Sequence, residues 1–195
     1  FNLYCYLWRM IDWFLTRFLQ RKALKKVVNP HHGRFVSLHD AVKVGFIVNA
    51  DNTGSAKAVH ELRQELQKRR IEYCGICVDL RKKPLGEPEF LSTPFMTIIH
   101  KDNLNWYGLP DEKIVSEFIL DHFDILIDMT SGKRIFAVDY ILSRADVSLR
   151  IGITDKSPSP YDMTISAGKD SAGNAGELMK SIIIYLTTIH TDKKK

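Results

Sequence analysis

The sequence lacks most of the features by which an enzyme or a secreted protein is identified. Its 195 residues include only three cysteines, too few and too odd in number for a disulfide framework. The complete phosphate loop and the dinucleotide-binding fingerprint are absent. No serine or cysteine forms a recognisable pattern with a histidine that would predict a nucleophile and its base. These absences favour a non-catalytic protein of a reducing compartment, which we expect to be the cytoplasm.

The histidines and cysteines also give little support to a metal site. His31, His32 and His39 lie close in sequence, but no cysteine or carboxylate joins them at the spacing of zinc ligands. Cys74 and Cys77 have C-x-x-C spacing inside a predicted strand, where residues i and i+3 point to opposite faces. We therefore expect no metal, no cofactor, and two cysteines that belong to the hydrophobic core.

The net charge of +5 is concentrated at one end of the chain. Residues 1–30 contain six basic residues and a single acidic residue, Asp12, whereas the remainder contains equal numbers of both. Any attraction to phosphate groups is therefore expected in this first segment. Binding to nucleic acid is only weakly supported, because one short basic turn without a recognised fold signature is poor grounds for it.

Residues 1–28 predict a basic amphipathic helix. At about 100° per residue, most of its surface is apolar and one narrow stripe is polar, comprising Asn2, Cys5, Arg9, Asp12, Thr16 and Gln20. The basic residues follow the apolar run, which is the reverse of a secretory signal. A membrane span would place Arg9 and Asp12 near the bilayer centre at a cost of about 2.5–3.5 kcal/mol each. We therefore expect the helix to dock on a surface, with its polar stripe facing water.

Two kinds of surface fit this helix equally well, because an amphipathic pattern does not distinguish a lipid face from a protein face. On a membrane, the aromatic rings would lie at headgroup level and the lysines would meet anionic lipid. Alternatively, the helix packs on its own domain, on a second copy or on another protein. The predicted contact residues are Trp8, Trp13, Phe14, Phe18, Arg21, Lys22, Lys25 and Lys26. Membrane docking would make the protein peripheral at the inner membrane.

After a linker at residues 29–42, the pattern predicts a single α/β domain over residues 43–192. Short apolar runs alternate with amphipathic helices, as in βα repeats. The predicted strands are 43–49, 71–80, 95–100, 123–129, 149–153 and 161–166, and the predicted helices are 53–70, 110–121, 132–144 and 177–190. Right-handed crossovers would join them into a three-layer, mostly parallel, doubly wound (Rossmann-like) sheet with helices on both faces.

Two loops at the carboxyl ends of strands form the predicted ligand site, because doubly wound sheets bind ligands at this edge. The loops contain Asp51, Asn52, Thr53, Asp128, Thr130, Ser131, Gly132, Lys133 and Arg134. Each loop is expected to open a helix whose free backbone amides attract anions. In a simpler interpretation, Asn52 and Ser131 cap their helices, and Lys133 and Arg134 are solvated. This site gives the alternative hypothesis, a small enzyme or binding protein for a phosphorylated or nucleotide-type ligand.

Trp106 and Tyr107 lie in a predicted loop, where large aromatic residues are unusual. They either pack the loop onto the core or form a contact surface for a partner or a membrane. Packing is the commoner outcome and is the expectation here.

Three segments carry a resemblance to known families: residues 106–108 (WYG), 123–128 (FDILID) and 149–153 (LRIGI). With these segments in this order, about residues 20–190 resemble an uncharacterised Bacteroidota family, a domain of unknown function, which implies no activity. About residues 43–153 also resemble the N-terminal half of heptosyltransferase-like glycosyltransferases. Those enzymes bind the sugar nucleotide mainly through a second Rossmann-like domain, for which 195 residues leave no room. The preferred hypothesis is therefore a non-catalytic interaction or scaffolding module that docks through its N-terminal helix.

Overall fold

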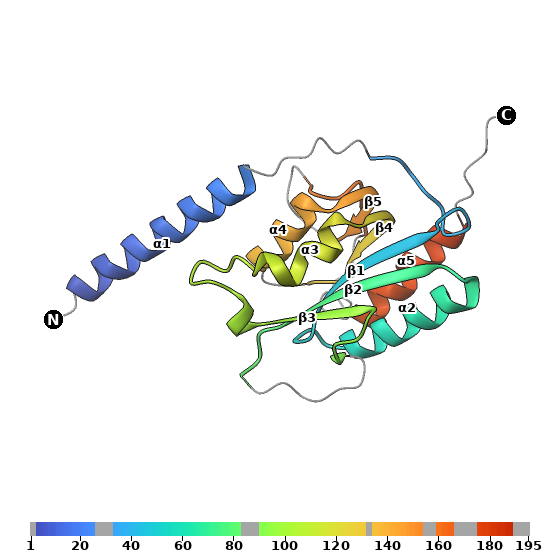
Figure 1. Cartoon of the computed structure of the whole chain (residues 1–195), viewed down its shortest axis with the longest axis horizontal. Coiled ribbons are helices and arrows are strands. Elements are labelled where there is room, and N and C mark those ends of the chain that lie inside the picture. The colour runs from blue at the N-terminus through green and yellow to red at the C-terminus, as the bar shows by residue number, and fades with distance from the viewer. Residues whose placement is uncertain are drawn as a thin grey trace.

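The described part of the computed structural model comprises residues 3–25, 33–82, 90–131, 134–153, 159–165 and 175–188. Its centre is a parallel sheet covered by helices on both faces, and one further helix projects away from this body (Figure 1). The α/β class and the N-terminal helix predicted from the sequence are both confirmed.

All strand pairs of the sheet are parallel. The strands are β1 (Lys43–Asn49), β2 (Glu72–Asp79), β3 (Met96–His100), β4 (His122–Asp128), β5 (Asp146–Gly152) and β6 (Met163–Thr164). They lie in the order β3-β2-β1-β4-β5-β6, which is the doubly wound order of Rossmann-like sheets. The order reverses between β1 and β4, so these two strands define the edge at which such folds bind ligands.

Two hydrophobic cores lie on opposite faces of the sheet. Helices α2 (Ser55–Arg69) and α5 (Ala175–Thr188) cover one face, and α3 (Glu112–Leu120) and α4 (Phe136–Arg144) cover the other (Figure 1). Strand β1 contributes to both cores, because side chains alternate along a strand: Phe46 packs beneath α2 and α5, and Ile47 beneath α3 and α4. Cys77 belongs to the first core and Cys74 borders the second, which confirms that the two sulfur atoms point apart.

Both helices that follow the predicted ligand loops begin later than the sequence indicates. Helix α2 begins after Gly54, whose φ of 75° is left-handed, so glycine rather than Asn52 is the N-cap. Helix α4 begins at Phe136 with Ile135 as its N-cap, so Ser131 is not the cap of this helix and Arg134 precedes it. The interpretation of Asn52 and Ser131 as N-caps is therefore wrong.

Close packing between β1 and β2 depends on Gly75. A Cβ atom on Gly75 would overlap the Cζ and Cε2 atoms of Phe46, a ring that is completely buried. Protein interiors have few voids into which such a ring can move. The two strands can therefore pair in this register because position 75 carries no side chain.

We predict that Gly75→Ala lowers the free energy of unfolding by about 1–3 kcal/mol, the usual cost of overpacking a core. Urea denaturation measures this loss. Combining it with Phe46→Leu should cost less than the sum of the two single substitutions, because the smaller side chain relieves the clash. Additive losses would show that the ring of Phe46 does not restrict position 75.

Candidate functional site

Polar side chains gather where β1 and β4 end side by side. The backbone NH of Met129 donates to the carbonyl oxygen of Ile47 (2.8 Å), which fixes the end of β4 beside β1. By strand alternation, Asn49 and Asp128 lie on the face covered by α3 and α4. This edge is the site predicted from the sequence.

Asp128 is the central group of this edge and is only 1% exposed. Its Oδ1 accepts a hydrogen bond from the backbone NH of Thr130 (2.8 Å), and its Oδ2 accepts one from the hydroxyl of Tyr161 (2.5 Å). Burial raises the pKa of this carboxyl above its ordinary value, although both hydrogen bonds act in the opposite direction. Burial and the neighbouring carboxyl also raise the pKa of Tyr161.

The ring of Tyr161 covers the end of β5, next to the ends of β4 and β1. A Cβ atom on Gly152 would lie 2.5 Å from the Cζ atom of Tyr161, so the ring rests directly on the glycine. From there its hydroxyl reaches Asp128, 33 residues away in sequence. The phenol group of Tyr161 therefore covers the ends of β5 and β4, beside the point where the strand order reverses.

The two predicted loops meet, but only some of their residues contribute to this edge. Asn52 is the link: its Oδ1 accepts from the Nδ2 of Asn49 (3.3 Å), and its Nδ2 lies 3.5 Å from the carbonyl oxygen of Met129, a weak contact. Asp51 is exposed, and the carbonyl oxygen of Thr53 instead accepts from the backbone NH of Ala175 at the start of α5 (3.0 Å).

The basic half of the predicted site offers less to an anion than the sequence indicates. Arg134 forms an ion pair with Asp139 of α4, and Ser131 lies partly buried before the helix. Gly132 and Lys133 lie outside the described residues. A phosphate at this edge would face the carboxyl of Asp128 and compete with Asp139 for Arg134, so the described geometry does not favour an anionic ligand.

A second buried carboxylate, Asp79 at the end of β2, was missed by the sequence reasoning. Arg81 holds it in a bidentate pair, with Nε donating to Oδ1 and Nη2 to Oδ2, both at 2.8 Å. These hydrogen bonds lower the pKa of Asp79. An acidic residue at a strand end, with an arginine two positions later, is the signal by which this pair could have been found.

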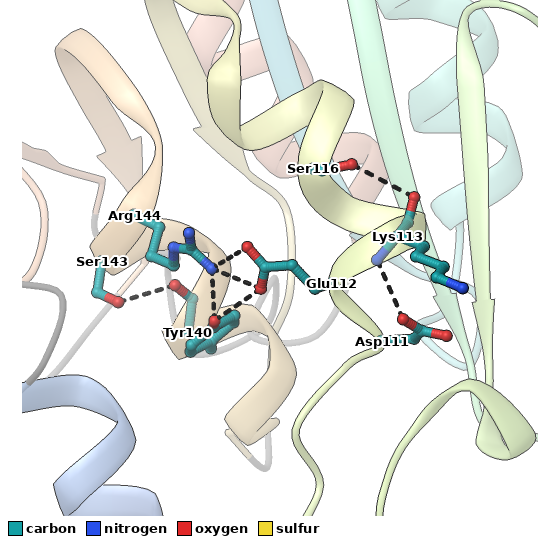
Figure 2. Close-up of polar contacts among 7 residues, drawn as sticks. All are labelled: Asp111, Glu112, Lys113, Ser116, Tyr140, Ser143 and Arg144. Carbon is teal, nitrogen blue, oxygen red and sulfur yellow. Dashed lines mark hydrogen bonds and ion pairs between the residues drawn. The ribbon is translucent and has the colours of Figure 1, made fainter.

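A polar cluster on the outer face joins α3 to α4 (Figure 2). Nη1 of Arg144 donates to both carboxylate oxygens of Glu112 and to the hydroxyl of Tyr140 (2.6 Å), and that hydroxyl donates to Oε2 of Glu112 (3.1 Å). Burial raises the pKa of Tyr140. Because the three side chains bind one another, the cluster ties α3 to α4.

Helix α1 (Leu3–Lys25) attaches to the body by an unexpected face. Thr16 and Gln20, which belong to the polar stripe, are partly buried, and Nε2 of Gln20 donates to the carbonyl oxygen of Tyr107 (2.8 Å). The expectation that this stripe faces water is therefore wrong for these residues, although Asp12 is exposed. The side chains of Cys5 and Arg9 lie outside the description.

The apolar side of α1 is left uncovered. The large apolar side chains exposed on it are Trp8, Met10, Ile11, Trp13, Phe14, Leu15 and Phe18. Arg21, Lys22 and Lys25 are exposed too, and no described ion pair involves α1; Lys26 lies outside the described residues. Among the described residues, no helix is both long enough and apolar enough to cross a bilayer.

Trp106 is 63% exposed, so the expectation that it packs onto the core is wrong. It lies in a turn organised by Asn105, whose Oδ1 accepts from the backbone NH groups of Tyr107 (3.2 Å) and Leu109 (2.9 Å). Gly108 closes the turn with a φ of 86°. The turn therefore holds Tyr107, and with it the acceptor for Gln20, in a fixed position.

Comparison with known proteins gives a family but no activity. The profile of DUF6913, a family of unknown function, matches residues 14–189, which include the second half of α1 and the whole body. No curated protein matches the chain.

We predict that Tyr161→Phe lowers the free energy of unfolding at neutral pH by about 1–3 kcal/mol, the usual cost of leaving a buried acceptor without its hydrogen-bond partner. The exposed Tyr185 provides the control, because Tyr185→Phe also removes one hydroxyl and should leave stability unchanged. Urea denaturation of both variants measures the difference, and equal stabilities would contradict a structural role for the Asp128–Tyr161 hydrogen bond.

The loss caused by Tyr161→Phe should shrink at acid pH. Since the folded pKa of Asp128 is raised, this carboxyl stabilises the fold below its unfolded pKa and loses that contribution as pH rises through its folded pKa. The hydrogen bond from Tyr161 lowers the pKa of Asp128, so removing the hydroxyl raises this pKa further and extends the loss of stability to higher pH. A deficit that is constant with pH would mean that Asp128 does not titrate in this range.

Proposed function

The chain belongs to the DUF6913 family of unknown function, and we propose from its geometry that it is a non-catalytic module that docks on an anionic membrane surface through α1. The observation that carries the proposal is the uncovered outward face of α1, which is apolar and then basic along its length. The α/β body would be the part that the helix brings to the membrane.

The outward face of α1 has the chemistry of an interfacial helix. At about 100° per residue, Ile11, Phe14, Phe18, Lys22 and Lys25 lie within about a quarter of the helix circumference. Laid flat on a bilayer, the apolar side chains would enter the headgroup and acyl boundary by about 5–10 Å. The basic side chains would then meet anionic headgroups, each contributing about 1 kcal/mol.

The attachment of α1 supports this orientation. Gln20 binds the body and Thr16 beside it is partly buried, both on the side opposite Phe18, so the apolar face points outward without any rearrangement. Asp12 lies about 120° from Phe18 around the helix and stays in water when the apolar face meets lipid. Docking therefore desolvates no acidic group of the described helix.

Cytoplasmic location and attachment to the inner membrane are part of this proposal, as is the absence of a catalytic role. Descent from a heptosyltransferase-like fold stays a prediction. The alternative function, binding of a phosphorylated or nucleotide-type ligand at the strand ends, has no specific observation in its favour, because Tyr161 covers Asp128 and Arg134 is paired.

We predict that the full-length chain co-floats with vesicles that contain anionic lipid and binds neutral vesicles more weakly. Phe14→Ser combined with Phe18→Ser should lower the partition coefficient at least tenfold, because burying one such side chain is worth about 1.5–3 kcal/mol and about 1.4 kcal/mol is a factor of ten. Salt should weaken binding, since raising it from about 0.1 to 1 M shortens the screening length from about 10 to 3 Å.

The matched control is Leu120→Ser combined with Ile184→Ser. Leu120 (83% exposed) and Ile184 (63%) are at least as exposed as Phe14 (61%) and Phe18 (63%), but Leu120 and Ile184 lie on the body. The control should float like the unmodified chain. Equal flotation of the two double variants would exclude α1 as the docking element. A chain that binds no vesicle but self-associates in size-exclusion chromatography would replace the membrane with a second copy.

A further inference from the structure

The flank of the docking face carries two arginines one helical turn apart, Arg17 and Arg21. We propose that they form a clamp for a phosphomonoester headgroup, so that α1 prefers lipids with a terminal phosphate over other anionic lipids. This inference rests on the membrane docking proposed above and names the lipid chemistry that the same helix recognises.

Arg17 is held by its neighbour Trp13. The Cζ atom of Arg17 lies 5.5 Å from the centroid of the Trp13 ring, one turn earlier on the same flank. Contact with an aromatic ring restricts the guanidinium group and lowers the entropy lost when it binds a ligand. Because Arg17 lies about 100° from Phe18 around the helix, its guanidinium group is on the flank of the docking face, at the level expected for headgroup phosphates.

Arg21 brings a second guanidinium group next to the first. Residues four apart on a helix have Cβ atoms about 5–6 Å apart, and both side chains are exposed. Like charges at this spacing repel each other. In the described structure neither arginine has an acidic partner, since Asp12 lies on another side of the helix, Asp139 of α4 is paired with Arg134, and Glu112 is paired with Arg144. A bound anion would remove this repulsion.

Guanidinium chemistry decides which anion fits. Each arginine presents parallel NH donors that bind two oxygens of a phosphate at once, whereas lysine acts as a point charge. A phosphomonoester carries about −1.5 to −2 charges at neutral pH and three acceptor oxygens. A phosphodiester carries one charge and offers two such oxygens. Two adjacent guanidinium groups therefore match the phosphomonoester better in charge and in number of acceptors.

The test compares the full-length chain on two kinds of phosphatidylcholine vesicle, one with phosphatidic acid and one with phosphatidylserine, adjusted to equal zeta potential. We expect a several-fold higher partition coefficient on phosphatidic acid. Arg17→Lys combined with Arg21→Lys keeps every charge but removes both guanidinium groups, and it should abolish this preference while binding to phosphatidylserine stays unchanged. Lys22→Arg combined with Lys25→Arg, which adds guanidinium groups elsewhere on the helix, should leave the ratio unchanged.

The outcomes separate the two proposals. If the unmodified chain binds both vesicles equally, or if the double lysine variant keeps the preference, the clamp is wrong and membrane docking stands. If the arginine control raises the preference as much as the lysine variant lowers it, guanidinium number rather than the Arg17 and Arg21 positions sets the ratio, and the clamp is again wrong. If the unmodified chain binds neither vesicle, membrane docking and the clamp fail together.

Discussion

Burial of β1 on both faces is the constraint from which the rest of the fold follows. Its side chains enter two separate cores, so helices must cover both sides of the sheet. The neighbours of β1 are β2 and β4. The chain therefore adds β2 and β3 on one side of β1 and then returns to add β4, β5 and β6 on the other side. The reversal sets the carboxyl ends of β1 and β4 side by side, with nothing from the sheet itself to cover them.

The polar edge is a consequence of that reversal, and the protein provides hydrogen-bond partners for its buried carboxyl groups from its own side chains. Asp128 has left water at a cost that raises its pKa, and the phenol of Tyr161 supplies the hydrogen bond that partly offsets the cost. At the end of β2, Arg81 pairs with Asp79, and these hydrogen bonds lower the pKa of that carboxyl. Among the described residues, these pairs use hydrogen-bonding groups that a ligand could otherwise bind at the edge where other doubly wound folds hold ligands.

The sequence predicts those parts of the fold whose cause is local. The strand at residues 43–49 is predicted to the residue, because a buried strand is a continuous apolar run bounded by polar residues. The starts of α2 and α4 were predicted wrongly because their causes are conformational. Gly54 adopts a left-handed φ and is the N-cap of α2, and Ile135 is extended immediately before α4. Asp128 was found from its position at a strand end. Tyr161 was missed because its role depends on a contact that only the tertiary fold creates.

The same distinction explains why α1 was predicted as a helix but its orientation was not. The spacing of apolar residues identifies an apolar face and a polar stripe, and the ordinary expectation is that the polar stripe faces water. The hydrogen bond from Gln20 to the backbone of Tyr107, across 87 residues, attaches that stripe to the body instead. Both cores are already closed by α2, α3, α4 and α5, so no core requires the apolar face of α1. Soluble monomers rarely expose contiguous apolar patches of this kind. The proposed docking on a membrane therefore rests on two features of α1: an apolar face that the fold does not use, and basic residues after it that no described ion pair neutralises.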